Sequence, residues 1–378
     1  MDNGLFRVDD ITVEMPNKTL SDNVAKITVV GVGGGGCNMV NHMIQEGTRR
    51  IDLISANTDL QVLNISRAPK KIQLGAKLTK GLGAGMKPEV GRDSAIESYE
   101  EIKSTLTGAD IVFIAAGLGG GTGTGAAAII AKAAKEIGAL TVSVVTKPFT
   151  WEGKKRAGLA NLGLEEIKKV SDSIIVVPND RLLDIVDKDI GMKDAFKIID
   201  NILYQAVNGM SEVILNPGNS DINTDFADVR TIMQHKGMAL MGIGRAKGED
   251  AAIKALDAAT NSPLLDKMSL SGAKGILIHF NIHPQISMFA INNVMEKIHE
   301  TIDSNAEIIF GTTSDDSLQK DEVKITIVAT GFESKPEPKK QESTPSDGAK
   351  QNIITDKDNY LDVPPLMRDY VVQYHLSE

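Results

Sequence analysis

The chain has 378 residues, of which 42% are hydrophobic and 24% are charged, with one cysteine and a net charge of −9. This composition is typical of a globular protein of two or three domains and excludes wholesale disorder. A single cysteine excludes an internal disulfide framework. The negative net charge argues against non-specific binding to the DNA or RNA backbone, because such binding needs a basic surface.

Residues 1–25 show no sustained period and lack a basic segment followed by an apolar block, so we expect a flexible extension and no signal peptide. From Lys26 onward, β-branched strands alternate with helices, which is typical of a parallel sheet covered on both faces. The strands are expected at 27–30, 51–55, 110–116, 140–146 and 173–177, and the helices at 38–45, 89–107, 124–137 and 152–170. Residues 26–190 therefore predict one α/β domain with a Rossmann-like parallel sheet.

The longest uncharged run, residues 111–131, could span a bilayer by length alone. Six glycines and two threonines cluster within it, however. We therefore expect a strand, a loop and a helix there, and no insertion into a membrane.

A long central helix is expected over residues 191–215, and the Asn-Pro-Gly sequence at 216–218 ends it. The pattern then changes to a second, mixed α/β domain over residues 216–332. Its strands are expected at 238–243, 276–282, 306–312 and 323–330, and its helices at 249–260 and 285–303.

Residues 333–358 are expected to be a disordered linker, because their prolines and charges come with too few large apolar residues to pack a core. Apolar residues return at 360–368, within a final segment 359–378. A short apolar patch on a flexible tether predicts a docking peptide that folds on a partner. An unstructured tail with chance hydrophobic residues is the alternative, and residues 369–378 have no functional interpretation.

Residues 31–38 are rich in glycine and lie between a predicted strand and a predicted helix. The N–H groups and the dipole at a helix N-terminus attract anions, and glycine lets the backbone approach a phosphate closely. The segment also fits G-x-G-x-x-G, so a nicotinamide-dependent oxidoreductase is one alternative. A tight turn without any ligand is another.

A second glycine-rich segment, residues 117–125, again lies between a strand and a helix. Two such segments at strand ends of one sheet would form a two-sided cradle for a polyphosphate. The sequence has no G-x-x-x-x-G-K-[ST] motif, so binding would depend on backbone N–H groups, threonine hydroxyls and a bound cation. A third glycine-rich segment, residues 81–88, is placed to close over the phosphates.

The sequence Gly-Gly-Gly-Thr-Gly-Thr-Gly at 119–125 resembles the signature of the tubulin/FtsZ family in its bacterial form. Residues 145–149 with Glu152 and Arg156 resemble a second motif of that family, and residues 223–229 a third. Residues 362–368 are similar to its C-terminal peptide. The resemblance implies a cytoplasmic GTPase that polymerises head to tail into the filaments of the division ring at midcell, on the inner face of the membrane.

The resemblance also implies that GTP and GDP are the ligands, with Mg²⁺ bound alongside the nucleotide. Phe196 and Asp200 are four residues apart on the long helix and therefore share a face. A carboxylate can accept from guanine N1–H and the 2-amino group, which adenine does not offer, and Phe196 can stack on the base. Without the family match, an ordinary amphipathic pair would be the preferred interpretation.

By the same match, Asn179 contacts the base, Glu152 the ribose and Arg156 the nucleotide. The positions that match the family's phosphate-binding residues are Gly34, Gly35, Gly36, Cys37, Asn38, Gly121, Thr122 and Gly123. Cys37 is otherwise interpreted as a small residue tolerated beside glycine. Trp151 is expected to cover the nucleotide or to pack nearby, and His279 and His283 to be solvated or to face a partner, without metal spacing.

The expected catalytic residues are Asn223, Asp225 and Asp228. A helix of about 24 residues spans roughly 36 Å, so these residues are expected to lie far from the phosphates of their own subunit. The resemblance implies that the acidic loop of one subunit completes the site of the next, where the two acids would orient the attacking water. Such a heterologous contact does not close and generates a filament.

Residues 216–221 are slightly longer and more polar than the usual stretch of the family. A GTP-binding filament protein with negligible hydrolysis is therefore the third alternative. For the C-terminal peptide, the resemblance implies membrane-tethering and regulatory division proteins as partners, through Asp362, Pro364, Leu366 and Arg368.

Overall fold

The computed structural model describes residues 25–48, 50–184, 186, 189–215, 226–262 and 270–332. Asn223 and Asp225 lie outside the described residues, as do the expected linker and the four docking residues of the C-terminal peptide. The expected domain boundaries therefore stay predictions.

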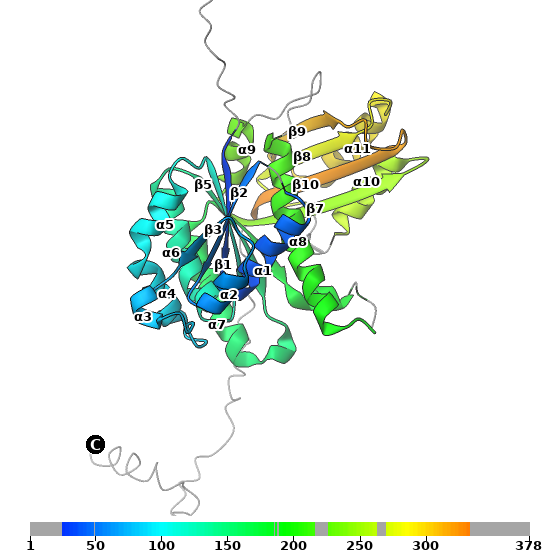
Figure 1. Cartoon of the computed structure of the whole chain (residues 1–378). Coiled ribbons are helices and arrows are strands. Elements are labelled where there is room, and N and C mark those ends of the chain that lie inside the picture. Colours follow the sequence, from blue (N-terminus) through cyan, green and yellow to red (C-terminus); the bar gives the residue numbers. More distant parts are fainter. Residues whose placement is uncertain are drawn as a thin grey trace, which may run out of the picture. The chain divides into compact units, whose positions relative to one another are not determined.

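Within the described residues, ten strands form one sheet in the order β3-β2-β1-β4-β5-β6-β7-β10-β8-β9 (Figure 1). The bounds of the strands are β1 Ile27–Val32, β2 Ile51–Asn57, β3 Lys70–Gln73, β4 Ile111–Gly117, β5 Leu140–Lys147, β6 Ser173–Pro178, β7 Gly237–Lys247, β8 Gly275–Ile282, β9 Glu307–Ser314 and β10 Glu322–Phe332.

The first six strands of this order pair in parallel, which confirms the predicted Rossmann-like sheet. The order 3-2-1-4-5-6 is that of a doubly wound sheet, in which the winding direction reverses between β1 and β4. Beyond β6 the sheet becomes mixed, because β10 is antiparallel to both β7 and β8. The fold therefore has a parallel first part and a mixed second part, as the sequence predicts.

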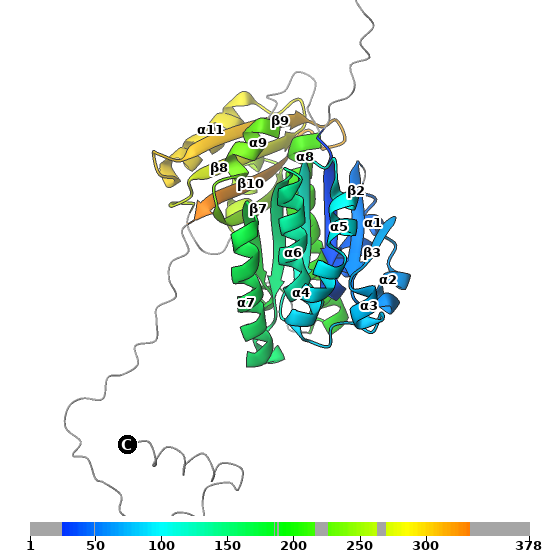
Figure 2. The same cartoon turned by 90° about the vertical axis from the view of Figure 1, so that its left-hand side faces the viewer.

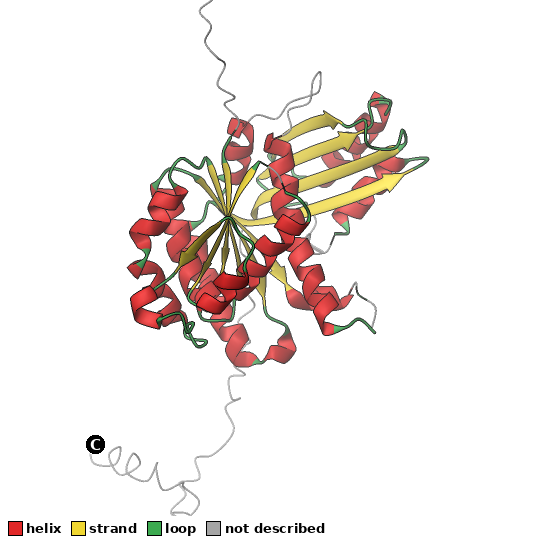
Figure 3. Ribbon diagram, viewed as in Figure 1, coloured by secondary structure: helices red, strands yellow, loops and turns green. Residues whose placement is uncertain are grey.

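Helices cover both faces of the sheet (Figures 2 and 3). Their bounds are α1 Gly33–Gln45, α2 Leu60–Ile65, α3 Ala76–Thr79, α4 Pro88–Glu97, α5 Tyr99–Leu106, α6 Thr122–Glu136, α7 Lys154–Val170, α8 Met192–Leu215, α9 Phe226–Met233, α10 Ala251–Thr260 and α11 Met288–Thr301. Two short 3₁₀ helices, η2 Thr150–Glu152 and η3 Asn179–Asp184, follow β5 and β6.

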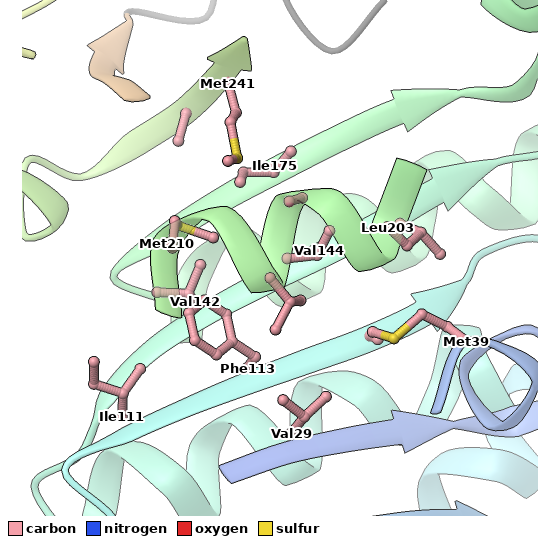
Figure 4. Packing of buried hydrophobic residues seen from close by; sticks show 14 of the residues in the cluster. Val29, Met39, Ile111, Phe113, Val142, Val144, Ile175, Leu203, Met210 and Met241 are labelled. Atoms are coloured by element: carbon pink, nitrogen blue, oxygen red, sulfur yellow. The ribbon is translucent and has the colours of Figure 1, made fainter. Parts of the chain in front are cut away.

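The two hydrophobic cores of the parallel part follow from the period-2 alternation of its strands. Val29 and Phe113 face α1 and α8, and Figure 4 shows them in one cluster with Met39 of α1 and with Leu203 and Met210 of α8. The neighbouring strand positions face α4, α5, α6 and α7 on the opposite side. Burial of each large apolar side chain contributes roughly 1.5–3 kcal/mol, which explains the near-continuous apolar runs.

Helix α8 packs against both parts of the sheet. A Cβ atom added to Gly209 would lie 2.5 Å from the Met241 Cε of β7, so a larger residue there would require the Met241 side chain to move. The other face of the mixed part packs against α10 and α11 through a third core. One continuous helix of 24 residues therefore contacts the first part near its start and the second part near its end.

Three sequence-based expectations need correction. Helix α1 begins at Gly33, so most of the first glycine run is a helical turn and not a loop. The single helix expected over 89–107 is two helices that meet at Ser98, whose hydroxyl accepts from the Gly75 N–H (3.1 Å) and donates to the Gln73 carbonyl (3.3 Å). The short elements α2, β3 and α3 are absent from the prediction because they carry little periodicity.

The uncharged run over 111–131 is strand β4 followed by a turn and the first residues of α6, as expected. None of the helices in the described part of the chain has the length and apolar character that crossing a bilayer requires.

Candidate nucleotide site

The first two glycine-rich segments meet at the carboxyl ends of β1 and β4, where the winding of the sheet reverses. These strands are neighbours, with Val32 opposite Ala116. Helix α1 begins directly after β1, and α6 begins at Thr122 after a turn that follows β4. Neither helix has a side-chain N-cap, so the N–H groups of both first turns are available to an anion.

The two segments pack directly on one another, and this contact requires glycine. Gly33 has a φ of +72°, and a Cβ atom added to it would lie 2.8 Å from the Gly123 nitrogen. Within the second segment, a Cβ atom on Gly123 would lie 2.4 Å from the Gly117 carbonyl oxygen, so the turn between β4 and α6 also requires glycine. Larger residues would separate the two helix N-termini and so would open the cradle.

A cavity of about 460 Å³ opens beside these helix N-termini. Eleven of the thirteen residues expected to bind GTP line it: Gly34, Gly35, Asn38, Gly121, Thr122, Gly123, Glu152, Arg156, Asn179, Phe196 and Asp200. The other two, Gly36 and Cys37, are buried behind the first turn of α1. The structure brings the expected residues together, and their individual roles stay predictions.

Asp200 lies on α8 with its carboxyl group in the cavity wall. Burial raises the pKa of Asp200 to about 6. The electrostatic interaction with His42 lowers this pKa, but by less than burial raises it. No described residue hydrogen-bonds to this carboxyl group. A half-buried acceptor without a partner favours a ligand that offers hydrogen-bond donors.

Asn179 directly follows β6 as the first residue of η3, and the residue is 6% exposed. Its Oδ1 atom is buried and has no hydrogen-bond partner among the described residues. An orphaned acceptor of this kind costs about 1–3 kcal/mol unless a donor satisfies it. Asn179 and Asp200 both line the cavity, so it offers two acceptors without partners to a base that carries N–H donors.

Phe196 is 41% exposed and packs edge to face against the buried Phe149, with ring centroids 6.1 Å apart at 84°. Trp151 stacks on Phe149, with ring centroids 5.3 Å apart. Trp151 does not line the cavity but borders a neighbouring apolar hollow. Phe196 therefore presents an aromatic surface to the cavity, and Trp151 packs nearby without covering it.

Glu152 and Arg156 form an ion pair across one turn at the start of α7. The second carboxylate oxygen of Glu152 accepts from the Phe149 N–H at 2.9 Å. The Glu152 side chain is 10% exposed and that of Arg156 is 41% exposed. The acid is thus fixed in place, while the guanidinium remains accessible from the cavity.

The sequence matches the GTPase domain of the Tubulin/FtsZ family over residues 26–187 and the C-terminal domain of the FtsZ family over residues 237–333. An FtsZ structure from M. jannaschii, described as an empty dimer, is 44% identical with a TM-score of 0.76. That similarity covers 82% of this chain and 90% of the other. The chain belongs to the FtsZ family.

A second FtsZ structure from M. jannaschii, that of a mutant, is also 44% identical, covers 82% of this chain and 92% of its own, and has a TM-score of 0.75. CetZ2 from Haloferax volcanii, in a structure described as a GTPγS-bound protofilament, is 20% identical with a TM-score of 0.69. The similarity covers 82% of this chain and 93% of the CetZ2 chain, and at this identity it shows the fold alone. Proteins of the Tubulin/FtsZ GTPase family bind GTP and GDP, so family membership gives this chain a guanine nucleotide as its ligand. It rules out the nicotinamide-dependent alternative.

Seven further residues line the cavity: Gly117, Leu118, Gly120, Thr146, Pro148, Ile199 and Leu203. The first three belong to the second glycine-rich segment, which the sequence already predicts as part of the cradle, and the other four were not predicted individually. Ile199 and Leu203 follow Phe196 by three and seven positions, so helical spacing could have found them. Thr146 and Pro148 belong to a segment that already resembled a family motif. They were missed because nothing in their residue type marks them as ligand contacts.

The third glycine-rich segment does not line the cavity. It packs against the second segment instead, and a Cβ atom on Gly121 would lie 2.7 Å from Ala84 Cβ. The expectation that it covers the phosphates is therefore not met in this structure. Its contribution here is to support the start of α6.

Cys37 and the histidines have local explanations. The Cys37 thiol is fully buried, its Sγ lies 3.8 Å from the Gly31 carbonyl oxygen, and burial raises the pKa of the thiol. His279 is 6% exposed and lies 2.9 Å from Thr313 Oγ1, so the expectation of a solvated histidine is wrong. Among the described residues, no cluster of three or more His, Cys, Asp or Glu side chains could hold a metal ion.

Asp228 lies on α9, away from the cavity. Arg230 of the same helix donates to the Gly138 carbonyl oxygen, just before β5, whereas Thr146 near the end of β5 lines the cavity. Eight residues of strand span roughly 25 Å. Asp228 therefore lies near the amino ends of the parallel strands, whereas the cavity lies at their carboxyl ends. Figure 2 shows α9 and α4 at opposite ends of α6.

Proposed function

We propose that this chain is a self-assembling cytoskeletal GTPase that polymerises head to tail into filaments of the cell-division ring. The supporting observation is the separation of Asp228 from the cavity of its own chain by the length of the sheet. An acid in that position can reach a nucleotide only on a neighbouring subunit. A head-to-tail contact is heterologous and continues into a filament.

In the proposed site, Asp200, Asn179 and Phe196 bind guanine, Glu152 binds the ribose and Arg156 contacts the nucleotide. The first turns of α1 and α6 bind the phosphates through backbone N–H groups. Fixed donors of this kind stabilise negative charge that develops on the phosphates during hydrolysis.

The neighbouring subunit contributes Asn223, Asp225 and Asp228. The two carboxylates would orient and polarise the attacking water. Mg²⁺, held by the nucleotide's phosphates, would neutralise developing charge. Since the described residues offer no cluster of protein ligands, the nucleotide itself is the expected holder of the ion.

GTP at the interface then favours assembly, and its hydrolysis to GDP weakens the contact and allows filament turnover. The C-terminal peptide, with Asp362, Pro364, Leu366 and Arg368, would bind membrane-tethering and regulatory division proteins. That attachment would hold the filaments at midcell on the cytoplasmic face of the membrane without insertion of this chain.

The test is phosphate release and light scattering recorded together over a range of protein concentrations. A site shared between subunits predicts a rate per subunit that rises with concentration and with scattering. GTP binding, measured at the same concentrations, serves as the control and should not change. A rate per subunit that stays constant down to submicromolar protein would contradict the shared site, and assembly without phosphate release would favour a filament protein with negligible hydrolysis.

A further inference from the structure

Arg230 makes two directional contacts on the short helix that carries Asp228. Its Nη2 atom donates to the Gly138 carbonyl oxygen at 2.6 Å, across 92 residues of sequence. Its guanidinium carbon also lies 5.7 Å from the centroid of the Phe226 ring, in cation–π geometry. The side chain therefore bridges the start of α9 and a turn in the first part of the fold.

That turn is the C-terminal end of α6. The Gly138 N–H donates to the Lys135 carbonyl (3.0 Å) and the Ala139 N–H to the Ala134 carbonyl (3.2 Å), while Gly138 has a φ of +83°. This is a Schellman motif, which ends a helix and leaves its negative dipole end beside the turn. A guanidinium is favoured there by charge as well as by the hydrogen bond.

The other end of α6 is part of the nucleotide site, because its first residue, Thr122, lines the cavity. One helix of 15 residues thus connects the phosphate-binding turn of a subunit to the anchor of its acidic helix. The apolar side of α9 is buried through Val229, Ile232 and Met233. This burial does not depend on the contacts of Arg230. Apolar burial is non-directional, however. The Thr330 hydroxyl of β10 donates to the Ile232 carbonyl oxygen at 2.7 Å and holds the C-terminal part of α9, whereas Arg230 supplies the directional contact to α6.

We propose that Arg230 is a positioning residue for GTP hydrolysis, which holds α9, and with it Asp228, against the C-terminal end of α6. This inference rests on the proposed role of Asp228 in the neighbour's site. Because Asp228 is only two residues from Arg230, loss of the anchor displaces the acid relative to the face that the next nucleotide meets. The nucleotide cavity of the same subunit is left intact.

The first experiment compares Arg230→Ala, Arg230→Lys and wild type. Arg230→Ala is expected to bind GTP with unchanged affinity and to lower kcat in the polymer by roughly 10–100-fold, since small misplacements of catalytic groups have effects of this size. Arg230→Lys retains a cation and a donor and should recover most of the rate. Lys297→Ala is the matched control, because it removes an exposed cation paired with Asp257 at 2.7 Å, away from α9.

The second experiment mixes variants, because a defect in the acidic half of a shared site can be complemented. Arg230→Ala subunits mixed with Asp200→Ala subunits form interfaces with one intact cavity and one intact acidic helix. Their phosphate release should exceed the sum of the separate rates. Arg230→Ala mixed with Asp228→Ala has no intact acidic helix and should show no gain.

An unchanged kcat in Arg230→Ala, or a loss that Asp200→Ala subunits do not complement, would overturn the positioning role. Arg230→Met keeps the aliphatic stem and replaces the alanine variant if thermal unfolding shows that the latter is not folded. A wild-type rate independent of protein concentration would instead refute the shared site itself, so the two failures are distinguishable.

Discussion

The hydroxyl oxygens of Thr58 and Thr122 lie 2.7 Å apart. Thr58 follows β2 and is fully buried, whereas Thr122 is the first residue of α6 and lines the cavity. The Thr58 carbonyl oxygen in turn accepts from the Thr79 hydroxyl at 3.3 Å. The end of α6 at the cavity is therefore held by a hydrogen bond to the residue that follows β2, a strand two positions away from β4 in the sheet.

Thr58→Val should weaken this arrangement while nearly preserving side-chain shape. Loss of one buried hydrogen bond is expected to lower the free energy of unfolding by about 1 kcal/mol. GTP affinity should fall as well, because the Thr122 hydroxyl loses its fixed orientation. Denaturant unfolding with and without GTP measures both effects. Thr260→Val, whose hydroxyl bonds only within α10, is the control and should leave GTP affinity unchanged.

Asn179→Ala should separate stability from binding. The Asn179 Oδ1 atom is buried without a partner, so its removal is expected to leave the nucleotide-free protein equally stable or more stable, by up to about 1 kcal/mol. GTP affinity should nevertheless fall about tenfold if a ligand donor normally satisfies this atom. Thermal unfolding and nucleotide titration test the pair of expectations. A variant that is destabilised without nucleotide would show that the amide has a structural role.

Asp200→Asn should change which base the site selects. An amide replaces one carboxylate oxygen by an N–H donor, which opposes the guanine 2-amino group but suits the C2 carbonyl of xanthine. We expect GTP affinity to fall roughly 10–100-fold and XTP affinity to rise, because the mismatch leaves buried donors unpaired. Competition between labelled GTP and XTP measures the ratio. Asp257→Asn, on the exposed surface of α10, should leave that ratio unchanged.

The pH dependence of GTP binding should report the same carboxyl group. Burial raises the pKa of Asp200 to about 6, above its ordinary value of about 4. The folded, nucleotide-free protein then binds this proton more tightly than the unfolded chain. Protonation of Asp200 therefore adds to the free energy of unfolding. This stabilisation is fully present below about pH 4 and is lost as the pH rises through 6.

In the proposed site guanine binds to the ionised carboxylate of Asp200, so we expect GTP affinity to fall as the pH is lowered below 6. Titrations of wild type and Asp200→Asn between pH 5 and pH 8 test this, because the phosphate groups of GTP titrate equally in both. If GTP affinity depends on pH in the same way in wild type and in Asp200→Asn, then Asp200 does not bind guanine as a carboxylate.

Much of the fold follows from local pattern. The β-branched runs and their spacing predict the parallel strands, because a strand buried on both faces must be apolar throughout. The Asn-Pro-Gly sequence predicts the end of the long helix. The division of residues 89–107 at Ser98 was not predictable, because that break depends on hydrogen bonds to Gln73 and Gly75, which lie far away in the sequence.

The sequence by itself determined that glycine-rich phosphate segments follow two strands and that Phe196 and Asp200 share one face of a helix. Both conclusions need only residue type and helical or strand periodicity. Only the tertiary structure decided that β1 and β4 are neighbours at the point where the winding reverses, which turns two separate segments into one cradle. The length of the long helix predicts that Asp228 lies far from the phosphates, but only the tertiary structure placed it beside the turn before β5, because that position depends on how α9 packs.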